Sequence, residues 1–269
     1  MGLGKLLLDR LGMRMRYQPL FERMMRFGAT GLGYGAPTVG NQSKKLEETA
    51  FAMRRKPAKG EREVIFDVGA NRGLYMDMVR RVSSPASLVL HAFEPDTVLS
   101  AELRERFADD PNVHVVSKGL SETPGTAVFH KHAQDDLSSF HVAQDHPTHY
   151  RNTSVSSSFE VPLTSIDAYC TEHSIAHIHH LKIDTEGHDL HVLRGARNML
   201  QERRIDNIQF EFSEMNLLSH TTFFEHWSLL HEHYDIHRMC YDGFYRIEAY
   251  DPLLHEAYYV VNFFAILRA

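Results

Sequence analysis

Three acidic residues each close a short apolar run in this sequence. They are Asp67 after 64–66, Glu94 after 88–93 and Asp184 after 181–183. Such runs are typical of buried strands, and ligands of open α/β sheets bind at the carboxyl ends of the strands. We therefore expect a binding or catalytic site at the ends of these strands.

The turn over 67–73, Asp-Val-Gly-Ala-Asn-Arg-Gly, leads from the first of these runs into a helical stretch. Gly69 and Gly73 permit a tight turn and a close approach of the backbone to a ligand. A dinucleotide fingerprint needs a further glycine where Asn71 stands, and Asp67 would repel a pyrophosphate. The turn favours a ligand with an ammonium and a sulfonium, as in S-adenosylmethionine. Asp67 as a helix cap is the alternative.

Glu94 is followed by Pro95, which keeps Glu94 out of helix. A carboxylate at the end of the neighbouring strand can accept hydrogen bonds from both ribose hydroxyls. The two acids together therefore favour a nucleoside-containing cofactor. Glu94 taken alone could be a surface acid.

The surrounding elements alternate between strand and helix. Strands are expected at 64–66, 88–93, 113–116, 181–183 and 208–212. Helices are expected at 74–82, at 188–202 and at 221–233, and a further helix follows the strand 88–93 and ends at about residue 107. This order predicts a mostly parallel α/β domain over 61–269. An insertion over 125–165 is a candidate lid, and 236–249 and 256–267 are expected as two final antiparallel strands.

The segment 181–196, LKIDTEGHDLHVLRGA, is the most specific motif. Together with DVGANRG and FEP, it resembles the FkbM family of S-adenosylmethionine-dependent methyltransferases. The resemblance covers about 62–215. It implies a Rossmann-like class I methyltransferase with a seven-stranded, mostly parallel sheet whose last strand is antiparallel, and O-methylation of a hydroxyl on a sugar, glycan or polyketide-like metabolite.

The resemblance also assigns the cofactor site. The methionine moiety would be lined by Asp67, Gly69, Ala70, Asn71 and Gly73, the ribose would bind at Glu94 and Pro95, and the adenine would lie beside Ser117, Gly119 and Leu120. The family's usual acceptor is a hydroxyl, which needs a base or a metal to remove its proton.

Asp184 is our candidate for that base, with Glu186 and His188 around it. Lys182 points to the same side of the strand as Asp184 and could steer a substrate oxygen or tune the carboxylate. The alternative is that Asp184 and Glu186 only begin a helix. A second alternative is Mg²⁺ held by Asp184 and Glu211 with Glu214 or Asn216. We expect no other metal site, and we interpret His177, His179 and His180 as a polar surface turn.

Charge divides the chain. Residues 1–60 carry a net +8 and 61–269 a net -14. We expect 1–60 to form a basic helical and Gly-rich arm. Such an arm could bind the surface of a membrane or contact a second subunit in a homodimer. The acidic body disfavours nucleic acid as a partner. Two cysteines, no secretory signal and no membrane-length apolar run favour a cytoplasmic protein. An N-methyltransferase, an NAD-linked oxidoreductase or a non-catalytic cofactor-binding relative remain alternatives.

Overall fold

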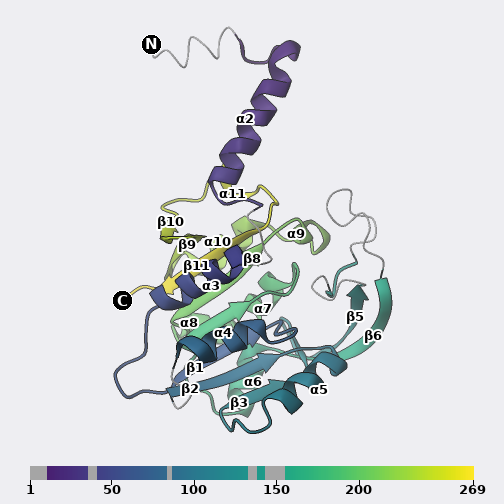
Figure 1. The fold of residues 1–269 in the computed structure, drawn as a ribbon, viewed down its shortest axis with the longest axis vertical. Coiled ribbons are helices and arrows are strands. Elements are labelled where there is room, and N and C mark those ends of the chain that lie inside the picture. The colour runs from purple at the N-terminus through teal and green to yellow at the C-terminus, as the bar shows by residue number, and fades with distance from the viewer. Residues whose placement is uncertain (1–10, 36–40, 84–86, 133–137, 143–154) are drawn as a thin grey trace.

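The computed structural model describes residues 11–35, 41–83, 87–132, 138–142 and 155–269. Its main sheet has eight strands in the order β10-β9-β11-β8-β7-β1-β2-β3 (Figure 1). The neighbours from β8 to β3 pair in parallel, and β11 is antiparallel to both of its neighbours. The strands are β1 Glu63–Val68, β2 Leu88–Phe93, β3 Val113–Val116, β7 His180–Ile183, β8 Asn207–Phe212, β9 Tyr234–Cys240, β10 Gly243–Arg246 and β11 Val261–Leu267.

The sheet has one strand more than expected. The predicted strand over 236–249 is divided into β9 and β10, which form an antiparallel hairpin. The break falls at Tyr241 and Asp242, which form a two-residue turn between the paired residues Cys240 and Gly243. Without β10, the remaining seven strands confirm the expected methyltransferase topology, including the antiparallel last strand β11.

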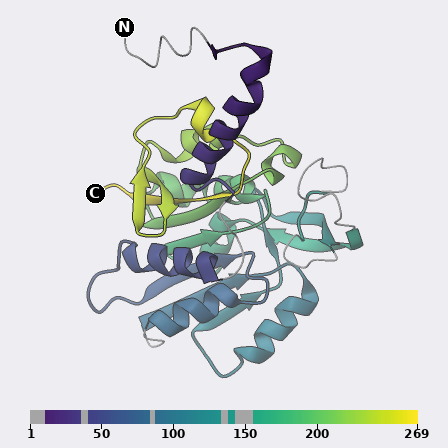
Figure 2. The ribbon, with the colours of Figure 1, turned by 45° about the horizontal axis from the view of Figure 1, so that its top comes forward.

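Helices cover both faces of the sheet (Figures 1 and 2). On one face, α3, α4 and α5 pack on β1, β2, β9 and β11. On the other, α6, α7, α8 and α10 contribute to the largest apolar cluster. The helices are α3 Asn41–Met53, α4 Leu74–Val82, α5 Thr97–Arg106, α6 Ile166–Glu172, α7 Asp189–Arg194, α8 Arg197–Gln201, α9 Met215–Leu218, α10 Phe223–Leu230 and α11 Pro252–His255.

The expected insertion forms a second sheet of three strands in the order β4-β6-β5. These are β4 Gly119–Leu120, β5 Gly125–His132 and β6 Val155–Thr164. The proposed lid loop over 131–158 lies in large part outside the described residues, at 133–137 and 143–154.

The amino-terminal region contains a short 3-10 helix η1 Met15–Tyr17, the helix α2 Gln18–Gly31 and α3. The helix α2 continues through Gly28 and ends at Gly31. Leu46 and Ala50 of α3 pack against Met239 and Phe264, so α3 shares the core of the body. None of the helices that the structure describes is long and apolar enough to cross a bilayer.

Alternation along the strands builds a polar row beneath α3 and α4. Apolar residues such as Phe66 and Phe210 face the largest cluster, so the residues next to them face the other side. The row crosses four strands and consists of Asp67 on β1, Lys182 on β7, Gln209 and Glu211 on β8 and Asn262 on β11. Strand register places Asp67 opposite Lys182, Lys182 opposite Gln209, and Glu211 opposite Asn262.

Candidate active site

A cavity of about 530 Å³ lies at the carboxyl ends of β1, β2 and β7. Side chains of α3, α4, the second sheet and β11 complete its walls. Most of the residues predicted for the site line it. These are Gly69, Ala70, Asn71, Glu94, Pro95, Gly119, Leu120, Lys182, Asp184 and Glu186.

Glu94 belongs to the cavity wall and is only 4% exposed. Its carboxylate accepts hydrogen bonds from the backbone N–H of Asn71 at 2.7 Å and of Asp96 at 2.9 Å. Burial raises the pKa of Glu94 to about 7, against the opposing effect of these two hydrogen bonds. Each carboxylate oxygen can accept a further bond, so the group can also bind hydroxyls of a ligand.

The turn after β1 is held in an unusual backbone shape. Gly69 has φ 77° and Asn71 has φ 46°. A Cβ at Gly69 would overlap the carbonyl oxygen of Asp184, so glycine lets the turns after β1 and β7 meet. The side-chain oxygen Oδ1 of Asn71 is buried in the cavity wall with no hydrogen-bond partner in the structure. A buried acceptor of this kind calls for a donor from a ligand.

Lys182 is the cation at the centre of the polar row. Its Nζ lies 3.4 Å from Oδ1 of Asp67 and 3.3 Å from Oδ2 of Asp184. Burial opposes its charge, but Asp184, Asp67 and Glu47 together raise the pKa of Lys182 above its ordinary value. The side chain therefore stays charged and holds both aspartates in place. Asp67 is 1% exposed and lies beneath Lys182 rather than in the cavity wall.

Asp184 keeps 42% of its side chain exposed and faces the cavity. It does not cap the following helix, because α7 begins at Asp189. Asp189 is the residue that orders this turn. Its carboxylate accepts from Oγ1 of Thr185 at 2.7 Å and from the backbone N–H of Glu211 at 3.0 Å, which ties the ends of β7 and β8 together.

Two further carboxylates, those of Glu211 and of Glu47 of α3, line the cavity together with Lys182 and Asp184. Burial, followed by the charges of Asp184 and Asp189, raises the pKa of Glu211 well above its ordinary value. Burial also raises the pKa of Glu47 to about 7, partly offset by Lys182. The cavity wall therefore combines carboxylates of different proton affinity.

Several lining residues were not predicted as members of the site, among them Lys44, Glu47, Tyr75 and Asn262. The helix carrying Lys44 and Glu47 has no motif, and only tertiary packing places it over the cavity. Asn262 did leave a signal, because it interrupts the apolar run of the last strand. Its register opposite Glu211 shows why a polar residue stands there.

Three other predicted residues lie outside the cavity lining. Gly73 packs against Leu103 and Arg106 of α5, and the hydroxyl of Ser117 accepts from Arg104 at 2.5 Å. His188 forms a hydrogen bond with Ser121 at 3.0 Å and another with His141 at 3.3 Å. Burial, together with His191 and His141, lowers the pKa of His188, so its ring is neutral.

Neither Glu214 nor Asn216 completes the magnesium site that was considered for Asp184 and Glu211. Among the described residues, Asp184, Glu211 and Glu214 do not form a group with ligand atoms within 4.8 Å of one another. Asn216 is used elsewhere, since its Oδ1 accepts from the backbone N–H of Ser213 and its Nδ2 donates to Thr221.

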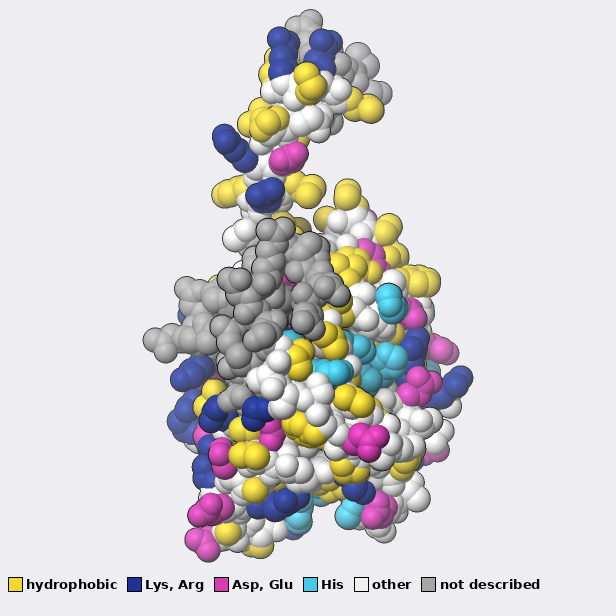
Figure 3. All heavy atoms as spheres, turned by 90° about the vertical axis from the view of Figure 1, so that its right-hand side faces the viewer, with side chains coloured by type: hydrophobic (Ala, Val, Ile, Leu, Met, Phe, Trp, Pro, Cys, Tyr) yellow, Lys and Arg dark blue, Asp and Glu magenta, His cyan; other side chains and the backbone are white. Residues whose placement is uncertain are grey.

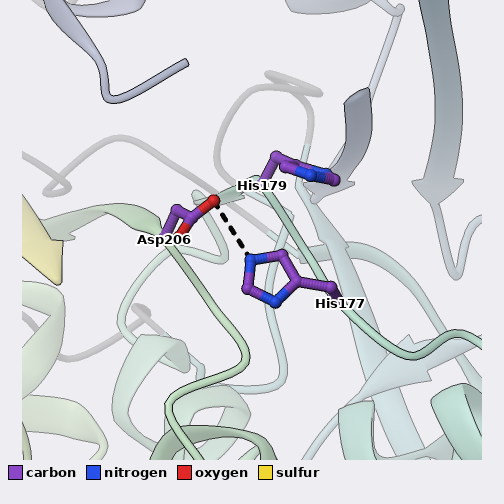
Figure 4. A group of neighbouring side chains, drawn as sticks. All are labelled: His177, His179 and Asp206. Carbon is purple, nitrogen blue, oxygen red and sulfur yellow. Dashed lines mark ion pairs between the residues drawn. The ribbon is translucent and has the colours of Figure 1, made fainter. Parts of the chain in front are cut away.

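His177, His179 and Asp206 do come within that distance, at the amino ends of β7 and β8 (Figure 4). Nε2 of His177 lies 3.0 Å from Oδ2 of Asp206. However, Nδ1 of His179 accepts the backbone N–H of Val64 at 2.9 Å, so its proton is on Nε2, where a metal would have to bind. We interpret the group as a hydrogen-bonded brace. His179 and His180 are buried, so the expected surface turn is wrong for them.

Comparison with known proteins supports the same family. The model of the methyltransferase FkbM domain matches residues 67–236. A 2-O-methyltransferase, NoeI of Sinorhizobium fredii, is 26% identical over 205 residues, covering 74% of this chain and 79% of its own length.

Solved structures give weaker likenesses. A methyltransferase FkbM of Methylobacillus flagellatus has a TM-score of 0.48 at 16% identity, covering 81% of this chain and 47% of that one, so the chain spans about half its length. Aeropyrum pernix fibrillarin, solved with S-adenosyl-L-methionine, has a TM-score of 0.42 at 12% identity, covering 82% and 74%. The family match spans more than half of this chain, which therefore belongs to the FkbM family of S-adenosylmethionine-dependent methyltransferases.

Proposed function

We propose that this enzyme methylates a hydroxyl of an uncharged, hydroxyl-rich acceptor such as a sugar. The observation that carries the proposal is the combination of two groups of residues in the cavity wall. Asn71 donates its backbone N–H to Glu94, and Asp184 pairs with Lys182 in a wall that also contains Glu47 and Glu211. The first group suits a nucleoside with an amino acid tail, and the second suits a hydroxyl that must lose its proton.

The residues present fit S-adenosylmethionine. Glu94 would accept the ribose hydroxyls, and the orphaned Oδ1 of Asn71 would accept from the ammonium group. When bound, this cofactor supplies an electrophilic methyl group on a sulfonium. Glycine at position 69 lets the turns that carry Asn71 and Asp184 approach each other closely.

Asp184 is the residue we assign to receive the acceptor's proton. Lys182 keeps Asp184 oriented, and the exposed part of the Asp184 side chain faces the cavity. Burial raises the pKa of Glu47 to about 7, so Glu47 can donate or accept a hydrogen bond near neutral pH. The pKa of Glu211 is raised as well, by burial and by the charges of Asp184 and Asp189. A hydroxyl can donate to an ionised carboxylate and accept from a protonated carboxyl group. A phosphate or carboxylate on the acceptor would instead be repelled by several negative charges.

The 2-O-methyltransferase NoeI supports oxygen as the methylated atom. An amine is the second candidate, because the excess of carboxylates around Lys182 would attract an ammonium group. For an amine acceptor, the same carboxylates would first have to remove a proton from the ammonium.

The test is transfer of an isotope-labelled methyl group to a panel of neutral sugars, sugar phosphates, polyketide alcohols and amines, with and without EDTA. We expect label on a neutral hydroxylated acceptor, with and without EDTA. Label on amines alone would overturn the O-methylation proposal. Transfer that EDTA abolishes and Mg²⁺ restores would establish the metal-dependent mechanism instead.

A further inference from the structure

The helix α2 has two chemically distinct sides. At 100° per residue, one side carries Leu20, Phe21, Met24, Met25 and Phe27, and the other carries Glu22, Arg23, Arg26 and Thr30. Amphipathic helices of soluble proteins normally bury the apolar side against the rest of the fold. Here none of the residues of α2 is buried.

The apolar side is open to solvent. Phe27 is 84% exposed, Met25 71% and Met24 58%. Figure 1 shows α2 standing away from the body, and Figure 3 shows apolar and basic side chains along it. A continuous apolar surface of this kind on a soluble protein marks an interaction surface.

The carboxyl end of α2 is anchored to the body. Ala29 packs against the largest apolar cluster, and Tyr34 just beyond the helix is buried. The backbone N–H of Gly35 donates to the carbonyl of Val260 at 2.9 Å, and Val260 lines the cavity. The helix is therefore fixed to the enzyme beside the cavity.

Apolar exposure continues where α2 meets the body. The hydroxyl of Tyr34 donates to the carbonyl oxygen of Leu254 in α11, which places α11 beside the base of α2. Leu253 of α11 is exposed, and so are Leu254 and Tyr259. The surface available to a partner thus extends beyond the helix itself.

We propose that α2 binds the surface of an anionic phospholipid bilayer, with its apolar side in the interface. The positive charge around α2 favours an anionic lipid surface as its binding partner. Arg14, Arg16, Arg23 and Arg26 stand against Glu22 alone in this region, whereas the body is acidic. Arginines beside an apolar helix face bind lipid phosphates while the apolar side chains enter the acyl boundary. A second copy is a weaker fit, because a helix of 14 residues, about 21 Å long, offers little area for a stable dimer.

The test is co-sedimentation of the full chain with vesicles of phosphatidylcholine, alone or with about 30% phosphatidylglycerol. We expect binding to the anionic vesicles, weakened by high salt. Phe27→Glu should lower the partition coefficient about tenfold or more, because it removes one large apolar side chain from the interface. Thr30→Glu is the matched control, with the same charge change on the polar side, and should lower it less than about threefold.

Circular dichroism would show that both variants keep their helix content. Equal loss in the two variants would overturn insertion of the apolar side. Absence of vesicle binding, with a dimer seen by light scattering and lost in Phe27→Glu, would assign the surface to a second copy. Neither result depends on the acceptor, so the outcome is independent of the proposed function.

Discussion

Acidic and basic side chains lie at both ends of the central strands, but they are paired differently at the two ends. At the amino ends, Arg54 binds both oxygens of Glu63 at 2.6 Å, and His177 pairs with Asp206. At the carboxyl ends, Lys182 is paired with both Asp67 and Asp184, and the carboxylates of Glu47 and Glu211 line the same cavity. Asn71 there keeps an unpartnered oxygen.

This difference separates stability from function. At the amino ends, Arg54 pairs with Glu63 and His177 with Asp206, so these side chains hold the chain together. The carboxyl ends keep an excess of carboxylates, and burial, reinforced by neighbouring carboxylates, raises the pKa of Glu94, Glu47 and Glu211. Such a surplus is a cost to the fold and is typical of sites that receive a ligand.

The sharpest contrast should come from Asp184→Asn and Asp206→Asn, the same change at opposite ends. We expect Asp184→Asn to lower methyl transfer by about 10²–10⁴-fold, because it removes the proton acceptor. Binding of S-adenosylhomocysteine by the same variant should change little. Asp206→Asn should leave the transfer rate per folded molecule within about threefold. Equal losses in the two variants would show that Asp184 has no special role.

Glu63→Gln tests the opposite end. The side chains of Arg54 and Glu63 are each 7% exposed, so removing one charge leaves the other buried without its partner. We expect a loss of about 3–5 kcal/mol in the free energy of unfolding, measured with urea. The control is Glu61→Gln, whose partner is His179 at 3.3 Å but whose side chain is half exposed, and it should cost less than about 1 kcal/mol. A stable Glu63→Gln protein with weakened cofactor binding would reverse our assignment.

Binding of S-adenosylhomocysteine should depend on pH through Glu94. Its pKa is raised to about 7, and the ionised form is the one that accepts from ribose hydroxyls. Protonation below that value therefore weakens binding. We expect affinity to fall by about tenfold between pH 8 and pH 6. The dependence should vanish in Glu94→Gln and persist in Glu47→Gln. An unchanged slope in Glu94→Gln would assign the titration to another group.

Zinc should have the smallest effect. Because Nδ1 of His179 accepts the backbone N–H of Val64, the ring proton is on Nε2, the atom that a metal would have to bind. Adding Zn²⁺ to EDTA-treated protein should therefore leave the melting temperature unchanged. A rise that disappears in His177→Ala would show that the group is a metal site.

The sheet was largely predictable because its strands are apolar runs closed by acids and turns. The central strands β1, β2, β3, β7 and β8 and the helices between them follow that pattern. The hairpin of β9 and β10 was missed although Asp242-Gly243 signals a turn. The predicted helix over 188–202 is divided at Gly195, where the backbone of Ser121 packs too closely for a side chain.

The site was predictable only where a motif marks it. Glu94, Asn71 and Asp184 follow strands and line the cavity as expected. Asp67 was expected to line it as well, but it is buried, and its Oδ1 lies 3.4 Å from Nζ of Lys182. Glu47 could not be predicted, because its burial depends on the packing of Leu46 and Phe51 of α3 onto distant strands. No local pattern encodes that contact.

The central claim is that Glu94 binds the nucleoside of the cofactor. It is tested most directly by calorimetric titration of S-adenosylhomocysteine into the wild type, Glu94→Gln and Glu61→Gln at pH 8, with NAD⁺ as a second ligand. We predict micromolar binding to the wild type and to Glu61→Gln, a loss of about tenfold or more in Glu94→Gln, and no binding of NAD⁺. Equal affinity in Glu94→Gln and the wild type would contradict the account.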